Sequence, residues 1–175
     1  TSHGISQELL VFAPVKGNAK ISRLKLKNLT SRKRSISITY FAELVLGVER
    51  AQSAPFVITE FDAATGAILA RNPYNNEFAE RVAFVATSAE IQFWTCDRRE
   101  FLGRNGTLAR PAAMLHTKLS GASGAGLDPC AAMQTSIEIA PDETFEIIFL
   151  LGEEDSSENA RASVLCYSQK RIVEE

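Results

Sequence analysis

The chain has 175 residues and a mass of 19.1 kDa, and its 45% hydrophobic and 23% charged residues are the balance of an ordinary globular domain. The 19 Lys and Arg against 21 Asp and Glu leave a net charge of −2, so no overall charge draws the chain to nucleic acid or to an anionic membrane. No apolar run approaches the roughly 18 residues that a membrane-spanning helix needs, and residues 1–4 do not resemble a secretory leader.

Alternation of apolar and polar residues predicts about nine strands. In chain order, the strand segments are residues 5–12, 23–27, 35–46, 56–61, 67–71, 81–88, 90–96, 132–139 and 144–151. All six prolines fall between these runs, as the hydrogen bonding of a β-ladder requires. Many short strands without intervening helices predict an all-β fold, an antiparallel sandwich.

Two short turns predict hairpins, one closed by residues 62–66 and one that joins residues 132–139 to 144–151. Only the tail has helical spacing, because Asp155 and Glu158 lie at the distance of a capping box. We expect a terminal helix over residues 155–172.

Residues 97–129 show neither pattern and contain five of the ten glycines. A loop of this length in a compact domain is usually functional or mobile. Its glycine-rich run, residues 121–126, lacks the lysine and the strand–loop–helix context of a phosphate-binding loop.

Charge is distributed unevenly along the chain. Eight basic residues and no acidic one occur between Lys16 and Arg34, and eight acidic residues and no basic one occur between Glu138 and Glu158. Two oppositely charged strand regions that lie near each other or face solvent would explain the pattern. The alternative is a basic face that meets a partner domain or an anionic ligand.

The chain shows no complete catalytic constellation. Its two histidines form no zinc-binding pair, and no metal or cofactor site is expected. The cysteines, Cys96, Cys130 and Cys166, are odd in number and far apart, which indicates reduced thiols in a cytoplasmic protein. We expect Cys96 and Cys166 to be packed, and Cys130 has no evident histidine partner that would make it a nucleophile.

Polar and charged side chains that could carry a function are most concentrated in residues 97–106. Arginine forks can hold sugar hydroxyls, carboxylates or phosphate, and an aromatic ring can cover a sugar face. The alternative is an ordered loop whose arginines pair with acids of the same domain. Three carboxylates of the long loop could converge as a glycosidase requires, although solvated loop acids are the simpler interpretation; they are Asp97, Glu100 and Asp128.

The sequence resembles the sandwich domain of glycoside hydrolase family 94, which contains cellobiose and chitobiose phosphorylases and the phosphorylase-like part of cyclic β-1,2-glucan synthases. Residues 21–30 (ISRLKLKNLT), 40–43 (YFAE) and 97–106 (DRREFLGRNG) carry the resemblance. The continuation over residues 119–132 is most similar to the cyclic glucan synthase branch.

The resemblance implies a galactose-mutarotase-like β-supersandwich, here partial, that precedes an (α/α)6 barrel. Residues 1–154 would form the sandwich, and residues 155–175 would begin the helical linker to the barrel. Family members cleave or form β-glucosidic bonds with inorganic phosphate, and the catalytic acid lies in the barrel, so no catalytic residue is expected in this chain.

In some members a sandwich loop reaches the active-site cleft, and this implies a role for residues 97–106. Arg98, Arg99 and Arg104 would contact substrate or phosphate, Phe101 would support the loop, and Gly103 and Gly106 would allow its turns. The expected substrate-binding residues are Arg98, Arg99, Phe101, Gly103, Arg104 and Asn105.

We therefore expect a non-catalytic, carbohydrate-binding and scaffolding domain of a glycoside phosphorylase or cyclic β-1,2-glucan synthase type enzyme acting on β-glucans. The implied partners are a β-glucan or oligosaccharide and the barrel of the same polypeptide, and a synthase parent would make the domain the cytoplasmic part of an inner-membrane protein. An exposed sheet edge would favour a homodimer. The first alternative is a free-standing carbohydrate-binding module that uses Phe93 and Trp94, and the second is an immunoglobulin-like interaction domain.

Overall fold

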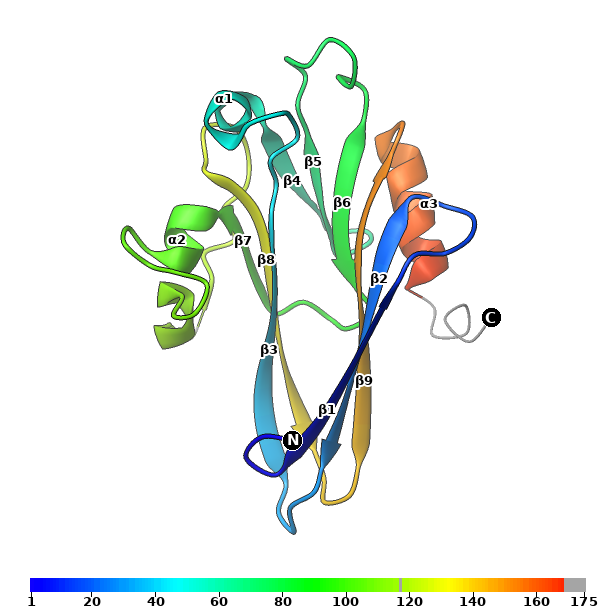
Figure 1. The fold of residues 1–175 in the computed structure, drawn as a ribbon, viewed down its shortest axis with the longest axis vertical. Helices are drawn as coiled ribbons and strands as arrows, with labels where there is room; N and C mark the ends of the chain where they lie inside the picture. Colours follow the sequence, from blue (N-terminus) through cyan, green and yellow to red (C-terminus); the bar gives the residue numbers. More distant parts are fainter. Residues whose placement is uncertain (117, 169–175) are drawn as a thin grey trace.

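A computed structural model describes residues 1–116 and 118–168, and Figure 1 shows its elements. The strands are β1 (Ile5–Phe12), β2 (Ala19–Asn28), β3 (Arg34–Glu43), β4 (Ile58–Asp62), β5 (Ala67–Arg71), β6 (Val82–Thr87), β7 (Phe93–Asp97), β8 (Pro129–Ile139) and β9 (Thr144–Glu154). The helices are α1 (Arg50–Ser53), α2 (Arg98–Leu102) and α3 (Ser157–Tyr167), and 3-10 turns are formed by η1 (Ala54–Phe56) and η2 (Ala112–Leu115).

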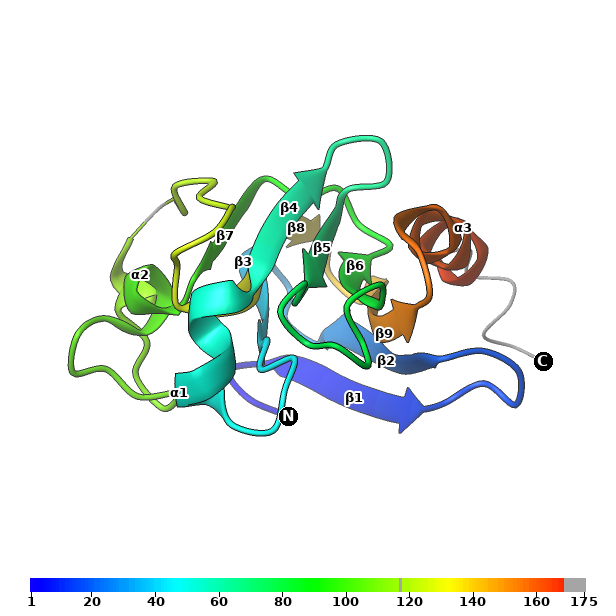
Figure 2. The same ribbon diagram turned by 90° about the horizontal axis from the view of Figure 1, so that it is seen from above.

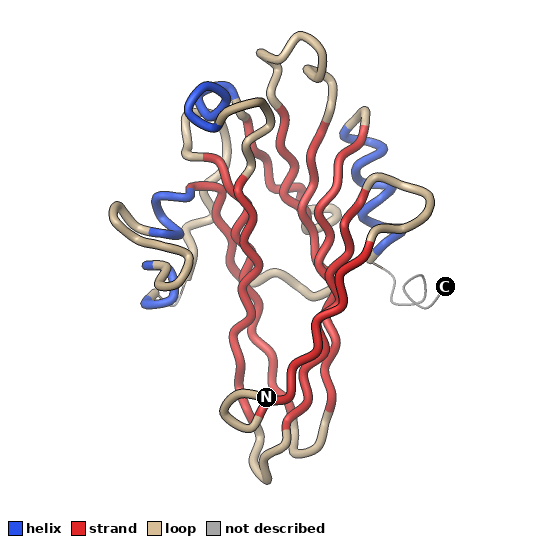
Figure 3. Tube along the Cα trace, in the orientation of Figure 1, coloured by secondary structure: helices blue, strands red, loops and turns tan. Residues whose placement is uncertain are grey.

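The strands form two antiparallel sheets that face each other. The larger sheet has the order β1-β2-β9-β6-β5-β4, and the smaller has the order β3-β8-β7. The view from above shows α3 against the outside of the larger sheet and α2 on the opposite side of the molecule (Figure 2). Strands dominate the trace (Figure 3), so the predicted antiparallel sandwich is confirmed.

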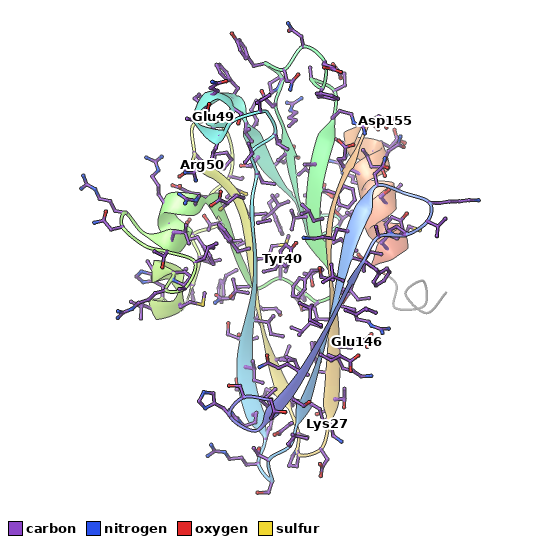
Figure 4. The ribbon with its side chains drawn as sticks, viewed as in Figure 1. Lys27, Tyr40, Glu49, Arg50, Glu146 and Asp155 are labelled. Atoms are coloured by element: carbon purple, nitrogen blue, oxygen red, sulfur yellow. The ribbon has the colours of Figure 1, made fainter. Side chains whose placement is uncertain are left out.

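The side chains that point between the sheets form the core. Ile38 of β3 and Ile147 of β9, one from each sheet, belong to one buried cluster. Tyr40 lies between the two sheets (Figure 4), and its ring stacks on Phe149 with the centroids 4.9 Å apart. Burial raises the pKa of Tyr40.

Helix α3 covers the upper part of the larger sheet with Ala160 and Val164, which are both fully buried. The N-cap is Ser156, whose Oγ accepts a hydrogen bond from Asn159 N at 3.2 Å. The Asp155 carboxylate instead accepts from the Asn159 side-chain amide at 2.6 Å. The helix ends at Tyr167, and residues 169–175 of the expected linker lie outside the described residues. Within residues 1–116 and 118–168, no helix is long and apolar enough to cross a membrane.

The hairpin predicted for residues 132–139 and 144–151 is wrong. Strand β8 pairs with β3 and β7, whereas β9 pairs with β2 and β6, so residues 140–143 cross from one sheet to the other. The connection from β2 to β3 crosses between the sheets in the same way. The predicted hairpin of β4 and β5 is confirmed.

The two charged regions of the sequence lie side by side, because β2 pairs with β9. Lys25 stands opposite Glu146 of β9 on one side and Glu8 of β1 on the other. Lys33 forms an ion pair with Glu138. The first interpretation of the charge pattern, as neighbouring strand regions, is therefore confirmed.

Residues 121–126 bridge the two sheets along the side where β4 and β7 lie. Gly121 N donates to the Trp94 carbonyl of β7 at 2.8 Å, and Thr59 N of β4 donates to the Gly124 carbonyl at 3.1 Å. β4 and β7 are the edge strands of the two sheets on this side, so the glycine-rich segment covers both edges. The segment therefore connects the two sheets by hydrogen bonds.

Candidate functional site

The segment that carries the predicted site residues begins with a short helix, α2. Asp97 is its N-cap, and its Oδ1 accepts a hydrogen bond from Arg99 N at 2.9 Å. Gly103 ends the helix with a φ of 85° and donates its N–H to the Arg99 carbonyl at 2.9 Å. The left-handed backbone at this position suits glycine, as expected for a residue that allows a turn.

Buried side chains attach this segment to the outer face of the smaller sheet. Phe101 and Leu102 are each only 3% exposed, and the Phe101 ring stacks on Phe41 of β3 with centroids 4.5 Å apart. Ala113 of η2 and Leu119 belong to the same cluster. Phe101 is therefore placed as a support of the segment, and its ring is not available to cover a sugar.

Residues 103–111 form a loop that projects from this anchor (left of α2 in Figure 1). Gly106 packs against the end of α2 so closely that a Cβ there would lie 1.6 Å from the Leu102 carbonyl oxygen. Arg104 and Asn105 are exposed on this loop. Among the described residues, Arg104 forms no ion pair.

Arg98 is bound by acids of its own domain. Its Nε lies 2.7 Å from Glu43 Oε1, and its Nη1 lies 3.4 Å from Asp128 Oδ2. The hydrogen bond to Glu43 raises the pKa of Arg98, and the charges of Glu43 and Asp128 act in the same direction. Arg50, labelled at α1 in Figure 4, approaches the same two carboxylates at 3.7 and 3.8 Å. The Arg98 guanidinium thus joins α2 to β3 and to the start of β8.

Arg99 occupies a different environment, because its side chain is 65% exposed and lies 3.6 Å from the Asp97 carboxylate. It lines a cavity of about 410 Å³ between α2 and η2. The other lining residues are Glu100, Gly103, Ala112, Ala113, His116, Lys118 and Leu119.

Hydrogen bonds within the domain occupy the Glu100 carboxylate. It accepts from Thr95 Oγ1, from Ser120 N at 2.7 Å and from Ser120 Oγ at 2.6 Å. The cationic groups left at the cavity are Arg99 and Lys118, both exposed. Such a site can bind an anionic group or hold sugar hydroxyls through charge-assisted hydrogen bonds.

The structure brings Arg99 and Gly103 together at this cavity, places Arg104 and Asn105 on the adjacent loop, and directs Arg98 and Phe101 into the fold. Sequence reasoning missed Lys118. No short motif includes it, and only its position in the same long loop could have indicated a role.

The carboxylates of the long loop do not converge into a catalytic pair. Asp97 caps α2, Glu100 binds Thr95 and Ser120, and Asp128 binds Arg98. No cluster of metal-ligating side chains occurs in the described part of the chain.

The thiols also offer no nucleophile at this site. Cys130 is fully buried, and burial raises its pKa, which keeps the thiol protonated. Cys96 is buried as expected, whereas the expectation that Cys166 is packed is wrong, because it lies on the exposed side of α3.

The aromatic residues assigned to a free-standing binding module are packed in the fold. The Trp94 ring stacks on Phe61 of β4 with centroids 4.4 Å apart, and this pair closes the space between the sheets. Phe93 packs beneath the α2–η2 segment, with Lys118 Nζ 5.7 Å from its ring centroid. Neither ring forms an open platform for a sugar.

The sequence matches the family described as glycosyl hydrolase 94, supersandwich domain, over residues 1–170. The chain belongs to this family, whose members include phosphorylases and a glucan synthase of carbohydrate metabolism.

Two characterised proteins are similar in sequence. Over 145 residues, the chain is 37% identical to the cyclic beta-(1,2)-glucan synthase NdvB of Rhizobium meliloti (strain 1021), a match that spans 82% of this chain and 5% of the synthase. Over 160 residues, it is 28% identical to cellobionic acid phosphorylase of Neurospora crassa, a match that spans 86% of this chain and 20% of the phosphorylase. The chain thus spans a fifth or less of the length of either relative.

A solved structure confirms the fold alone. The polysaccharide lyase BACCELL_00875 superposes with a TM-score of 0.58 at 9% sequence identity, over 94% of this chain and 22% of the lyase.

Proposed function

We propose that this chain is a non-catalytic, carbohydrate-binding and scaffolding domain of a glycoside phosphorylase or cyclic β-1,2-glucan synthase type enzyme that acts on β-glucans. The observation that carries the proposal is the cavity of about 410 Å³ at the base of the projecting loop, which Arg99 and Lys118 line together with Glu100. Its size lies within the range of roughly 300–1,000 Å³ that is typical of small-molecule sites.

In this proposal, Arg99 and Lys118 bind a sugar or phosphate in the cavity, while Arg104 and Asn105 contact substrate from the loop. The buried cluster around Phe101 fixes the segment on a sheet, and sites supported by rigid elements hold their groups in place better than free loops do. Arg98 acts on the site only by holding α2 in position.

The proposed partner is an (α/α)6 catalytic barrel of the same polypeptide, reached through the helical linker that α3 begins. The proposal is supported by the small share of each relative that this chain spans. The phosphate that the cavity would hold is a co-substrate of the parent enzyme. The cytoplasmic location remains a prediction from the cysteines.

Titration of the ¹⁵N-labelled chain with inorganic phosphate, cellobiose and the β-1,2-linked disaccharide sophorose tests the proposal. We expect saturable shifts of the amide signals of residues 99–103 and 116–120. Arg99→Gln and Lys118→Gln should each weaken binding at least about tenfold, which corresponds to 1.4 kcal/mol. Arg110→Gln removes an exposed charge of the same loop outside the cavity and is the matched control. If none of the three probes shifts these signals, the cavity is not the binding site.

In an intact parent enzyme, Arg104→Ala should lower phosphorolysis of β-linked glucans while the sandwich remains folded. Unchanged kinetics would show that Arg104 does not contribute to substrate binding.

A further inference from the structure

A second cavity, of about 420 Å³, opens at the end of the sandwich where α1 and the connection from β5 to β6 lie, which is the upper end in Figure 1. Residues 46–48, between β3 and α1, form one wall, and the β5–β6 connection, residues 72–81, forms the other. The lining is completed by Ala83 of β6 and Glu153 of β9, and Ala83 belongs to a buried cluster between the sheets. This cavity shares no residue with the one between α2 and η2.

The wall formed by residues 46–48 is held in a strained conformation. Leu46 has a φ of 42°, in the left-handed region that an apolar side chain rarely adopts. The buried Asn72 fixes this backbone, because its Nδ2 donates a hydrogen bond to the Leu46 carbonyl at 2.9 Å. Ser53 of α1 donates from its hydroxyl group to the Val45 carbonyl. Backbone strain persists only where surrounding contacts hold it, and it is concentrated at functional sites such as ligand clamps.

The opposite wall is ordered as well. Asn75 Oδ1 accepts hydrogen bonds from Glu77 N at 3.1 Å and from Phe78 N at 3.3 Å, and Arg81 N donates to the Phe78 carbonyl at 3.0 Å. Because its oxygen is used in this way, Asn75 offers its amide N–H groups to a ligand. The Phe78 side chain lines the cavity and is 51% exposed. Both walls are therefore formed before a ligand arrives.

An ion pair forms the polar end of the cavity. Arg81 donates from Nε to Glu153 Oε2 at 3.2 Å and from Nη2 to Glu153 Oε1. The hydrogen bond from Arg81 lowers the pKa of Glu153, so the carboxylate is ionised at neutral pH and the pair has no net charge. The guanidinium group retains further N–H donors, and the carboxylate retains further lone pairs. The pair can therefore donate to and accept from the same ligand.

The lining has the properties of a site for a neutral saccharide. Leu46, Val48 and Phe78 are apolar, and the ion pair adds donors and acceptors. A pyranose ring has the matching surfaces, because its C–H face is apolar and each of its hydroxyl groups both donates and accepts. The lack of net charge disfavours an anion, in contrast to the cavity of Arg99 and Lys118. The volume lies within the range of roughly 300–1,000 Å³ that is typical of small-molecule sites.

We propose that this cavity is a second, separate saccharide-binding site, at which a neutral glycan packs its ring face on Leu46 and Phe78. Its hydroxyl groups bond to Arg81, to Glu153 and to the side-chain amide of Asn75. That the glycan is a β-glucan rests on the proposed function, whereas the preference for a neutral saccharide rests on the cavity itself. A long glucan that reaches both cavities would bind more tightly than a short one that occupies either alone.

Titration of the ¹⁵N-labelled chain with cellobiose, sophorose and inorganic phosphate tests the proposal. The two disaccharides should produce saturable shifts of the amide signals of residues 46–48 and 72–81, and phosphate should not. Cyclohexanol, which has an apolar ring and a single hydroxyl group, is the control ligand. It should bind at this cavity at least about tenfold more weakly than the disaccharides, because it leaves most of the polar groups unpaired.

Variants identify the residues that bind. Phe78→Ala removes the ring from the wall and should weaken disaccharide binding at this cavity at least about tenfold. Leu165→Ala truncates a 57% exposed apolar residue on α3 and should have no effect. Arg81→Lys retains the positive charge beside Glu153 but loses the planar fork, so it should weaken binding while the domain remains folded. Arg99→Gln changes the other cavity and should leave these shifts unchanged.

The proposal would be overturned if neither disaccharide shifts the signals of residues 46–48 and 72–81, or if cyclohexanol binds there equally well. Equal binding of phosphate would overturn the assignment to a neutral ligand. Equal effects of Phe78→Ala and Leu165→Ala, or loss of the shifts in Arg99→Gln, would show that the signals do not report on binding at this cavity. Because residues 99–103 and 116–120 report on the other cavity, the two proposals fail separately.

Discussion

The side-chain amide of Asn28 donates a hydrogen bond to the main-chain carbonyl of Ile139 at 3.0 Å, across 111 positions of the sequence. Asn28 ends β2 and Ile139 ends β8, and both strands are followed by a crossing to the other sheet. The same Nδ2 group lies 2.8 Å from the Arg32 carbonyl and 3.1 Å from the Ala140 carbonyl. One fully buried side chain therefore joins the two crossings, from β2 to β3 and from β8 to β9, at the same end of the sandwich.

Replacement of Asn28 by Ala should lower the free energy of unfolding by about 2–4 kcal/mol, because it leaves buried carbonyl groups without their donor. Urea unfolding followed by tryptophan fluorescence measures the loss. Asn76→Ala, which truncates an exposed asparagine, should change stability by less than about 0.5 kcal/mol. Equal stability of the two variants would show that Asn28 does not hold the crossings together.

Periodicity predicted the strands well, because their alternation reflects which face is buried. It could not predict where residues 140–143 lead. A strand that turns back within its sheet and a strand that crosses to the facing sheet bury the same alternate residues. The difference depends on long-range pairing, here of β9 with β2 and β6.

The candidate site was predictable only in outline. The concentration of arginines in residues 97–106 located the segment, but the acids that bind Arg98 are Glu43 and Asp128, and Glu43 is 55 positions away. Arg99 has a similar sequence context and remains exposed. Tertiary neighbours, which the local sequence does not specify, decide which of the two adjacent arginines is structural.

Gly106→Ala should disrupt the projecting loop, because its Cβ would overlap the Leu102 carbonyl oxygen at 1.6 Å and the backbone must move. Limited proteolysis should show faster cleavage within residues 103–111, with the core of the domain still protected. Asn105→Ala changes the exposed neighbouring residue and should be cut at the wild-type rate. If both variants are cut at the same rate, the close packing on α2 does not order the loop.

The three cysteines should differ sharply in their reaction with a thiol reagent at neutral pH. Cys166 is exposed and should react at once in the native protein. Burial raises the pKa of Cys96 to about 11, and both Cys96 and Cys130 are inaccessible, so they should react only on unfolding. Titration with a chromogenic disulfide, before and after addition of denaturant, counts the thiols in each state.

Cys166→Ser should abolish the fast reaction of the native protein. After denaturant is added, the reagent should still detect two thiols, those of Cys96 and Cys130. Rapid native modification of either buried cysteine would mean that the region between β7 and β8 opens far more readily than its packing indicates.

Asp62 should make the stability of the domain dependent on pH, because it connects α3 to the turn between β4 and β5. Its Oδ1 lies 3.0 Å from Arg161 Nε, and its Oδ2 accepts hydrogen bonds from Thr65. Burial by itself raises the pKa of Asp62, but the hydrogen bonds from Thr65 and Arg161 and the charge of Arg161 outweigh it, and the net pKa is lowered.

A carboxyl group whose pKa is lower in the folded state contributes stability above its unfolded pKa of about 3.9 and loses that contribution as the pH falls through the folded value. Asp62→Asn should therefore lower the free energy of unfolding by about 1–3 kcal/mol at pH 7. The difference from wild type should narrow as the pH falls below about 4.

Urea unfolding of wild type and Asp62→Asn at several values between pH 7 and pH 2.5 measures this dependence. Glu77→Gln removes an exposed carboxylate and should reproduce the wild-type profile. If Asp62→Asn destabilises the domain by the same amount down to the lowest pH, the charge of Asp62 beside Arg161 is not what stabilises the contact with α3. The effect of the substitution would then come from a changed conformation of the turn.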